Sequence, residues 1–312
     1  MPYVLIHTFV QSYGVYLSHY LHNNIFPEAT SFDYAFIGGF NFSIAMLVAP
    51  FVTMCTRKFG KRLPMISGVM LQAGGFISAS FARRIWHLYL SQGILIGLGV
   101  GFIFIPSISI LSQWFSQKRS LANGVSSAGS GIGGVIFSFA TGAMIRHIGL
   151  GWSLRITGII TFVINLIAAL LLRDRNHIIR PLQLGFDTTL LRQYKVQLLL
   201  GWAFISMLGY ITLLYSLADF TISIDLSQSQ AIDIVAFLNL GTAIGRPFVG
   251  LLSDRYGRIE VAGLFTFFCG VLCFAVWLPA TSFGVTVLFA LLSGAILGTF
   301  WMVSGSLPKY AP

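Results

Sequence analysis

The chain has 312 residues, of which 56% are hydrophobic and only 9% are charged, and its mean hydropathy is +0.82. About a quarter of the residues of a soluble domain are charged, so this composition excludes an ordinary water-soluble protein and indicates one that is surrounded by lipid. The net charge of +10 does not indicate nucleic-acid binding, because the basic residues stand in short clusters between apolar stretches and not on one exposed face.

Apolar stretches follow one another along the whole chain. Each holds about 20 mostly apolar residues, the length that a helix needs to cross the hydrocarbon core of a bilayer. The linkers between them are short, which favours antiparallel neighbours. We predict ten membrane-spanning helices, at residues 3–20, 34–56, 63–81, 88–111, 120–145, 151–172, 196–219, 229–252, 260–279 and 283–306.

One linker is longer and polar, and it divides the chain. The predicted organisation is a six-helix bundle at residues 1–172, a connector at 173–195 and an incomplete bundle of four helices at 196–312. Linkers on the side of the connector carry thirteen basic residues, and the other linkers carry three. Because basic loops stay in the cytoplasm, we expect the connector to be cytoplasmic. The fold class is therefore an all-α, multi-pass integral membrane protein, for which the plasma membrane is favoured over an internal membrane.

A loop motif follows the eighth predicted span, where the sequence reads Gly-Leu-Leu-Ser-Asp-Arg-Tyr-Gly-Arg over residues 250–258. The loop after the second span repeats its order of basic residue, aromatic residue, glycine and basic residue over residues 58–61. Internal duplication of this kind is how many secondary carriers are built. The first copy has Arg57 where the second has Asp254, so the sequence does not predict a matching gate in the first half.

The second copy resembles the loop motif G-x-L-x-D-R-x-G-R of the major facilitator superfamily. The resemblance implies a gate at the cytoplasmic edge, in which the Asp254 carboxylate accepts charge-assisted hydrogen bonds from Arg255, Arg258 or a neighbouring helix. A solvated turn of basic residues is the alternative interpretation. The predicted gating residues are Gly250, Asp254, Arg255, Gly257 and Arg258.

A second recognisable stretch, residues 114–133, opens the fifth span. It resembles the aromatic-Phe-x-x-basic-Arg-x-x-Ala-x-Gly stretch of the monocarboxylate porter family. Family members have twelve helices in a 6+6 plan and carry small organic anions, usually with a proton, and some fungal members lie in gene clusters for secondary metabolites. The resemblance implies a secondary transporter that lacks the last two helices and moves a small organic anion or a secondary metabolite by alternating access. A non-transporting membrane sensor or an inactive truncated relative is the alternative.

Arg246 lies well inside the eighth span. A guanidinium at the centre of a bilayer costs about 2.5–3.5 kcal/mol on insertion scales, so we expect it to face a polar cavity. Its fork of donors suits a carboxylate, and the resemblance implies that it binds the substrate anion. A structural arginine bonded to carbonyl groups is the alternative. The family pairs this arginine with an aspartate, where this chain has Thr242, and uses a lysine where it has Gln11, so we do not predict proton symport.

Other polar residues within the spans are candidates to line the substrate pathway, with interhelical hydrogen bonding as the alternative for each. Glycines in the fifth span predict either close helix packing or a helix that slides or bends during transport. We find no cofactor or metal pattern and no motif of an integral-membrane enzyme, and the sequence leaves the oligomeric state open. The expected partners are a small-molecule substrate and the lipid bilayer. With Arg246, the predicted pathway residues are Gln11, Ser12, Tyr13, Asn123, Ser126, Ser127, Ser130, Tyr210, Asn239, Thr242 and Trp301.

Overall fold

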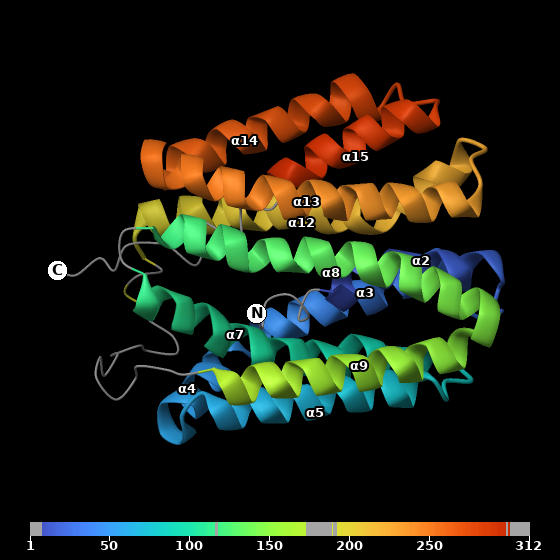
Figure 1. Cartoon of the computed structure of the whole chain (residues 1–312), viewed down its shortest axis with the longest axis horizontal. Helices are drawn as coiled ribbons and strands as arrows, with labels where there is room; N and C mark the ends of the chain where they lie inside the picture. The colour runs from blue at the N-terminus through green and yellow to red at the C-terminus, as the bar shows by residue number, and fades with distance from the viewer. Residues whose placement is uncertain (1–7, 116–117, 173–188, 190–191, 298, 300–312) are drawn as a thin grey trace.

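Long helices lie side by side and run along one common direction (Figure 1). The computed structural model describes residues 8–115, 118–172, 189, 192–297 and 299. Helices before residue 172 form what we call the first helix group: α2 (Thr8–His22), α3 (Ser31–Leu47), α4 (Ala49–Phe59), α5 (Arg62–Ala79), α6 (Ile85–Leu88), η1 (Tyr89–Leu95), α7 (Ile96–Trp114), α8 (Arg119–Ile148) and α9 (Leu150–Leu171). The second helix group contains α12 (Tyr194–Ser223), α13 (Gln228–Tyr256), α14 (Arg258–Leu272), η2 (Cys273–Trp277) and α15 (Phe283–Leu297).

Each of the ten predicted spans overlaps one helix or consecutive helical segments of the described residues, while positions 3–7 of the first span and 298 and 300–306 of the tenth lie outside them. Within the described part of the chain, six helices are long and apolar enough to cross a membrane, and a seventh is obtained if α3 and α4, which meet at a bend of 44°, form one span. The bend has a local cause, since Pro50 in the first turn of α4 has no N–H to continue the hydrogen bonding of α3. The sequence did not predict this bend, nor the π-helical turns η1 and η2.

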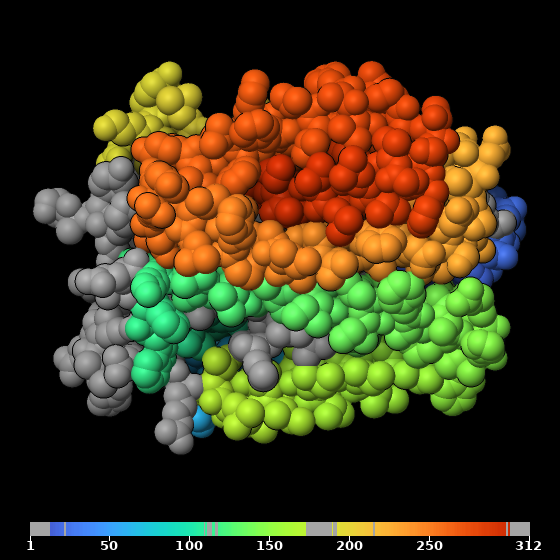
Figure 2. All heavy atoms as spheres, turned by 45° about the horizontal axis from the view of Figure 1, so that its top comes forward, coloured from blue at the N-terminus to red at the C-terminus, as the bar shows by residue number. Residues whose placement is uncertain are grey.

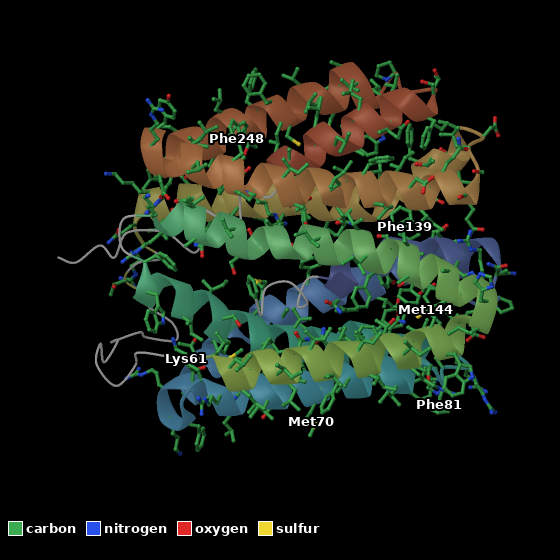
Figure 3. The ribbon with its side chains drawn as sticks, viewed as in Figure 1. Lys61, Met70, Phe81, Phe139, Met144 and Phe248 are labelled. Carbon is green, nitrogen blue, oxygen red and sulfur yellow. The ribbon has the colours of Figure 1, made fainter. Side chains whose placement is uncertain are left out.

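Large apolar side chains cover the flanks of the bundle. Met70 and Phe248 are each 59% exposed, and Phe139 is 49% exposed. Figure 3 shows these three side chains along the length of the helices, while nitrogen and oxygen atoms gather toward the two ends of the helix bundle. An apolar belt between polar ends is the surface that a bilayer requires, so the predicted multi-pass membrane protein is confirmed.

Contacts within each helix group hold the bundle together. In the first group α5 packs against α7 and α9, and in the second α13 packs against α12, α14 and α15. The groups meet mainly where α8 lies along α13, with further contacts of α2 to α12 and α13. Figures 1 and 2 show α8 in green directly beside α13 in orange. The division into bundles with a connector at 173–195 stays a prediction, because most of the connector lies outside the described residues.

Glycines allow α8 and α13 to approach until their backbones touch. A Cβ atom added to Gly124 would lie 2.5 Å from the Arg246 carbonyl oxygen, and one added to Gly131 would lie 2.5 Å from that of Asn239. At the other end of the pair, a Cβ on Gly250 would lie 2.7 Å from the carbonyl oxygen of Ser120. Such approaches exclude any side chain at these places. The packing role predicted for the small residues of the fifth span is therefore present in the structure.

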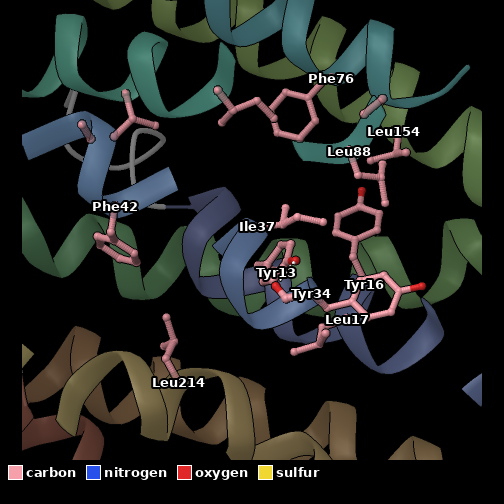
Figure 4. Close-up of a cluster of buried hydrophobic side chains, with 14 of the residues drawn as sticks. Tyr13, Tyr16, Leu17, Tyr34, Ile37, Phe42, Phe76, Leu88, Leu154 and Leu214 are labelled. Carbon is pink, nitrogen blue, oxygen red and sulfur yellow. Dashed lines mark hydrogen bonds between the residues drawn. The ribbon is translucent and has the colours of Figure 1, made fainter. Parts of the chain in front are cut away.

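Tyrosines of α2 fix the centre of the first helix group (Figure 4). The Tyr16 hydroxyl lies 3.2 Å from Ser153 Oγ and 3.1 Å from Thr157 Oγ1, both on α9. The Tyr13 hydroxyl donates to the carbonyl oxygen of Tyr34 on α3 at 3.0 Å. Since lipid gives helices no hydrophobic reason to associate, such bonds and close packing determine which helices pair.

Candidate functional site

Arg246 connects the two helix groups. Its side chain is 2% exposed, and its Nη1 donates to the carbonyl oxygen of Ser127 at 2.8 Å and to Ser130 Oγ at 2.5 Å, both on α8. The Ser130 hydroxyl in turn donates to the Ser127 carbonyl oxygen at 2.6 Å. A buried guanidinium needs acceptors, and Ser127 and Ser130 of α8 supply them here. The arginine therefore reaches across to α8, as the alternative interpretation of its sequence position expected.

The rest of the guanidinium is not saturated by these bonds. Arg246 Nε has no hydrogen-bond partner among the residues that the structure describes, and Tyr210 of α12 lies within interaction range of the guanidinium. Across the described part of the chain no carboxylate pairs with Arg246. Nη1 is thus bound to α8, while the Nε edge keeps unused donor capacity for an incoming acceptor.

A small crevice lies in the second helix group, close to this arginine. The room inside it is about 10 Å³, roughly what one water molecule needs. Tyr210 and Thr242 belong to its wall and also stand next to Arg246, the first through space and the second one helical turn away on α13. Its lining residues are Tyr210, Leu213, Leu214, Leu238, Thr242, Gly294 and Leu297.

Some predicted pathway residues make interhelical or local bonds. The Thr242 hydroxyl donates to the carbonyl oxygens of Leu238 and Gly294 at 3.0 and 3.2 Å, so it joins α13 to α15 while also lining the crevice. Tyr13 joins α2 to α3 through its hydroxyl. Both therefore follow the alternative that we gave for individual polar residues.

The other predicted pathway residues are distributed as follows. Asn239 of α13 is buried, Asn123 of α8 is buried and Ser126 of α8 is half-buried. Of the predicted pathway residues, the structure brings Ser127, Ser130 and Tyr210 next to the Arg246 guanidinium. Gln11 and Ser12 lie in α2 with side chains outside the described part, and Trp301 lies outside the described residues altogether.

The predicted gating motif joins α13 to the first turn of α8. Asp254 Oδ1 accepts from the Ser120 backbone N–H at 3.1 Å, and Oδ2 accepts from that of Leu121 at 2.9 Å. Arg258 Nε donates to Ser120 Oγ at 3.1 Å, while its Nη2 lies 3.8 Å from Asp254 Oδ1. The first N–H groups of a helix have no partner within the helix, and its positive end attracts a carboxylate. Asp254 therefore caps α8 from the other helix group, and Gly250 allows the approach.

The remaining residues of the motif shape the loop. Gly257 has a φ of +104°, which ends α13 and starts α14. Gly60, in the equivalent place of the first copy, has a φ of +78° between α4 and α5. The predicted repeat is thus visible in the backbone as well. Arg255 lies 5.3 Å from the centroid of the Tyr256 ring and so points to a local partner.

Sequence reasoning missed Ser120 and Leu121 as the partners of Asp254. Their contribution is mostly backbone N–H, which no side-chain pattern reveals. A usable signal was present, because every helix start leaves unpaired N–H groups and this start was expected on the same membrane side as the motif.

The comparisons with known proteins agree with this architecture. The profile of the Major Facilitator Superfamily matches residues 3–312. The chain is 36% identical over 300 residues to the "Probable transporter MCH2" of Saccharomyces cerevisiae, covering 95% of this chain and 63% of that protein. It is 30% identical to the "MFS transporter asaE" of Aspergillus flavus, covering 96% of this chain and 68% of that protein.

A solved structure shares the fold. It is described as a bacterial homologue of the human lysosomal transporter Spinster in an inward-facing, unoccupied conformation, and it aligns with a TM-score of 0.67 at 20% identity. The alignment covers 97% of this chain and 73% of the solved one. The predicted all-α bundle of major facilitator type is confirmed.

Proposed function

Because the chain belongs to the Major Facilitator Superfamily, we propose that it is a secondary transporter that moves an organic anion, either a small monocarboxylate or an acidic secondary metabolite, by alternating access. One observation carries the choice of an anion. Arg246 is 2% exposed, and no carboxylate of the described residues neutralises it. An unpaired buried charge is costly, so a bound anion would stabilise the site more than a neutral solute would.

The position of Arg246 supports the alternating-access part of the proposal. Its guanidinium lies between α8 and α13, which belong to different helix groups. A substrate held there can contact both helix groups. Secondary carriers commonly bind their substrate at such an interface between their two halves. In this proposal the two helix groups move against each other, residues 173–195 connect them, and Gly250, Asp254 and Arg258 hold their cytoplasmic ends together. The positive-inside pattern supports a cytoplasmic position for that end, and the plasma membrane is the proposed location.

Uptake by vesicles that contain the purified protein tests the role of Arg246. We expect Arg246→Ala to lower the uptake of radiolabelled carboxylates at least ~100-fold, because two charge-assisted hydrogen bonds to the substrate are lost. Arg246→Lys keeps the charge without the fork of donors and should give an intermediate rate.

Arg155→Ala is the matched control. Arg155 is an arginine of α9 that packs on Phe81 and Trp152, at 4.4 and 4.9 Å from the ring centroids, and donates to Ser80 Oγ at 3.0 Å. It lies within the first helix group, so its loss should change uptake per inserted molecule little. Equal uptake by the wild type and Arg246→Ala would show that Arg246 does not recognise the anion.

A further inference from the structure

Asn239 is a buried amide that the helix packing leaves unused. Its side chain is 1% exposed, and neither its Nδ2 nor its Oδ1 has a hydrogen-bond partner among the residues that the structure describes. Burying an amide without partners costs free energy. Other buried amides in this bundle differ, since Asn41 donates to the Gln92 carbonyl oxygen and Asn165 to Gln72 Oε1, each at 3.0 Å. The Asn239 amide can therefore both donate a hydrogen bond to a ligand and accept one from it.

Asn239 and Arg246 lie on one face of α13. Seven residues correspond to about 700° of helix rotation, within about 20° of two full turns, and to a rise of about 10 Å. Thr242, which lies between them on this face, lines the crevice. The two groups with unused hydrogen-bonding capacity, Arg246 Nε and the Asn239 amide, thus stand about 10 Å apart along one side of the helix.

The crevice that Thr242 lines, between these two positions on α13, is mostly apolar. Leu213 and Leu214 of α12 and Leu238 of α13 line the crevice, together with Leu297 of α15. The adjoining side of α13 faces the glycines of α8, where Gly131 lies against the Asn239 carbonyl oxygen and contributes no side chain. A ligand that fits this arrangement is charged at one end, apolar in the middle and capable of hydrogen bonding at the other end.

We propose that Asn239 is a second anchoring residue and that the substrate is an extended organic acid, with its carboxylate on Arg246 and a hydroxyl or carbonyl group about 10 Å away on the Asn239 amide. The inference rests on the proposed transport of an anion through Arg246. An amide both donates and accepts, so it satisfies either kind of oxygen. A short acid such as acetate reaches only Arg246, and a long unsubstituted acid leaves the amide unpaired.

Uptake of two probes by vesicles that contain the full chain tests this inference. The probes are octanoate and its terminally hydroxylated analogue, which share the carboxylate and the chain length and differ in one hydroxyl. We expect the wild type to favour the hydroxylated acid about tenfold in kcat/KM, because a site built to bond a hydroxyl rejects the analogue that lacks it. In Asn239→Leu, which keeps the branched shape of the side chain and removes the amide, the ratio should fall to about one.

The matched control is Asn165→Leu, which removes a buried amide of the first helix group that is bonded to Gln72. The ratio of the two probes should stay at the wild-type value in that variant, whatever the amount of inserted protein. If Asn239→Leu does not reach the membrane, Asn239→Ala gives the same ratio test. A ratio that is unchanged by the loss of the Asn239 amide, or that is already near one in the wild type, overturns the inference while Arg246-dependent uptake stands. If uptake is the same in the wild type and in Arg246→Ala, the proposed function itself is wrong, and the inference about Asn239 falls with it.

Discussion

Asp254→Asn should open the end of the bundle at which α8 begins. Asp254 accepts two backbone N–H bonds at 3.1 and 2.9 Å, and its side chain is only 13% exposed, so solvent screens them little. Asparagine keeps one acceptor oxygen and turns an NH₂ group toward a second donor. The closed arrangement therefore loses one charge-assisted bond, worth about 2 kcal/mol, and the attraction of a carboxylate to the helix start. About 2 kcal/mol corresponds to a roughly 30-fold shift toward the open arrangement.

The assay is the rate at which a water-soluble thiol reagent modifies a cysteine at Ser253. Ser253 is 2% exposed on α13 beside the capped end of α8, and cysteine is close to it in size. The native residues Cys55, Cys269 and Cys273 are first replaced by alanine. We expect Asp254→Asn to raise the rate about 30-fold. Asp219→Asn, at an exposed site on α12, is the control and should leave it unchanged. Equal rates with and without Asp254→Asn would refute the capping of α8 as the closing contact.

Two further predictions concern stability and are read from thermal unfolding of the detergent-purified protein. Gly131→Ala should lower the midpoint temperature of unfolding by several degrees, because the new Cβ lies 2.5 Å from the Asn239 carbonyl oxygen. Gly39→Ala is the control: it makes the same chemical change without a clash, because no atom lies within 4 Å of the added Cβ. Tyr16→Phe removes contacts of 3.2 and 3.1 Å to two hydroxyls of α9 and should lower the free energy of unfolding by about 1 kcal/mol. Tyr194→Phe is the control: this residue is 71% exposed, so its loss of a hydroxyl should leave the free energy of unfolding unchanged. Midpoints that do not separate each variant from its control would contradict the packing described above.

Much of the fold could be predicted because its signals are local. Runs of apolar residues define where a helix crosses a bilayer, so each of the ten predicted spans overlaps helical segments of the described chain. The depth of Arg246 followed from its place within one such run. The bend between α3 and α4 was missed, although Pro50 is its local cause, because proline in an apolar run does not always break a span.

The partners of the site could not be predicted in the same way. Thr242 was predicted to line the substrate pathway; it lines the crevice, and its hydroxyl bonds to Gly294 of α15, which is 52 residues away in the chain. Arg246 bonds on one side to Ser127, which is 119 residues away. Such pairings depend on which helices lie side by side, and no span by itself carries that information.

By itself the sequence determined that the chain is a helical membrane protein, where its helices run, and that one arginine lies well inside an apolar membrane-spanning stretch, because hydrophobic length and helix periodicity act over a few turns. The tertiary structure decided that α8 and α13 meet backbone to backbone, that Asp254 caps α8, and that the Asn239 amide and one edge of Arg246 keep unused hydrogen-bonding capacity. The physical reason is that helix association in lipid depends on close contact and on hydrogen bonds between distant segments, and these exist only once the helices are packed.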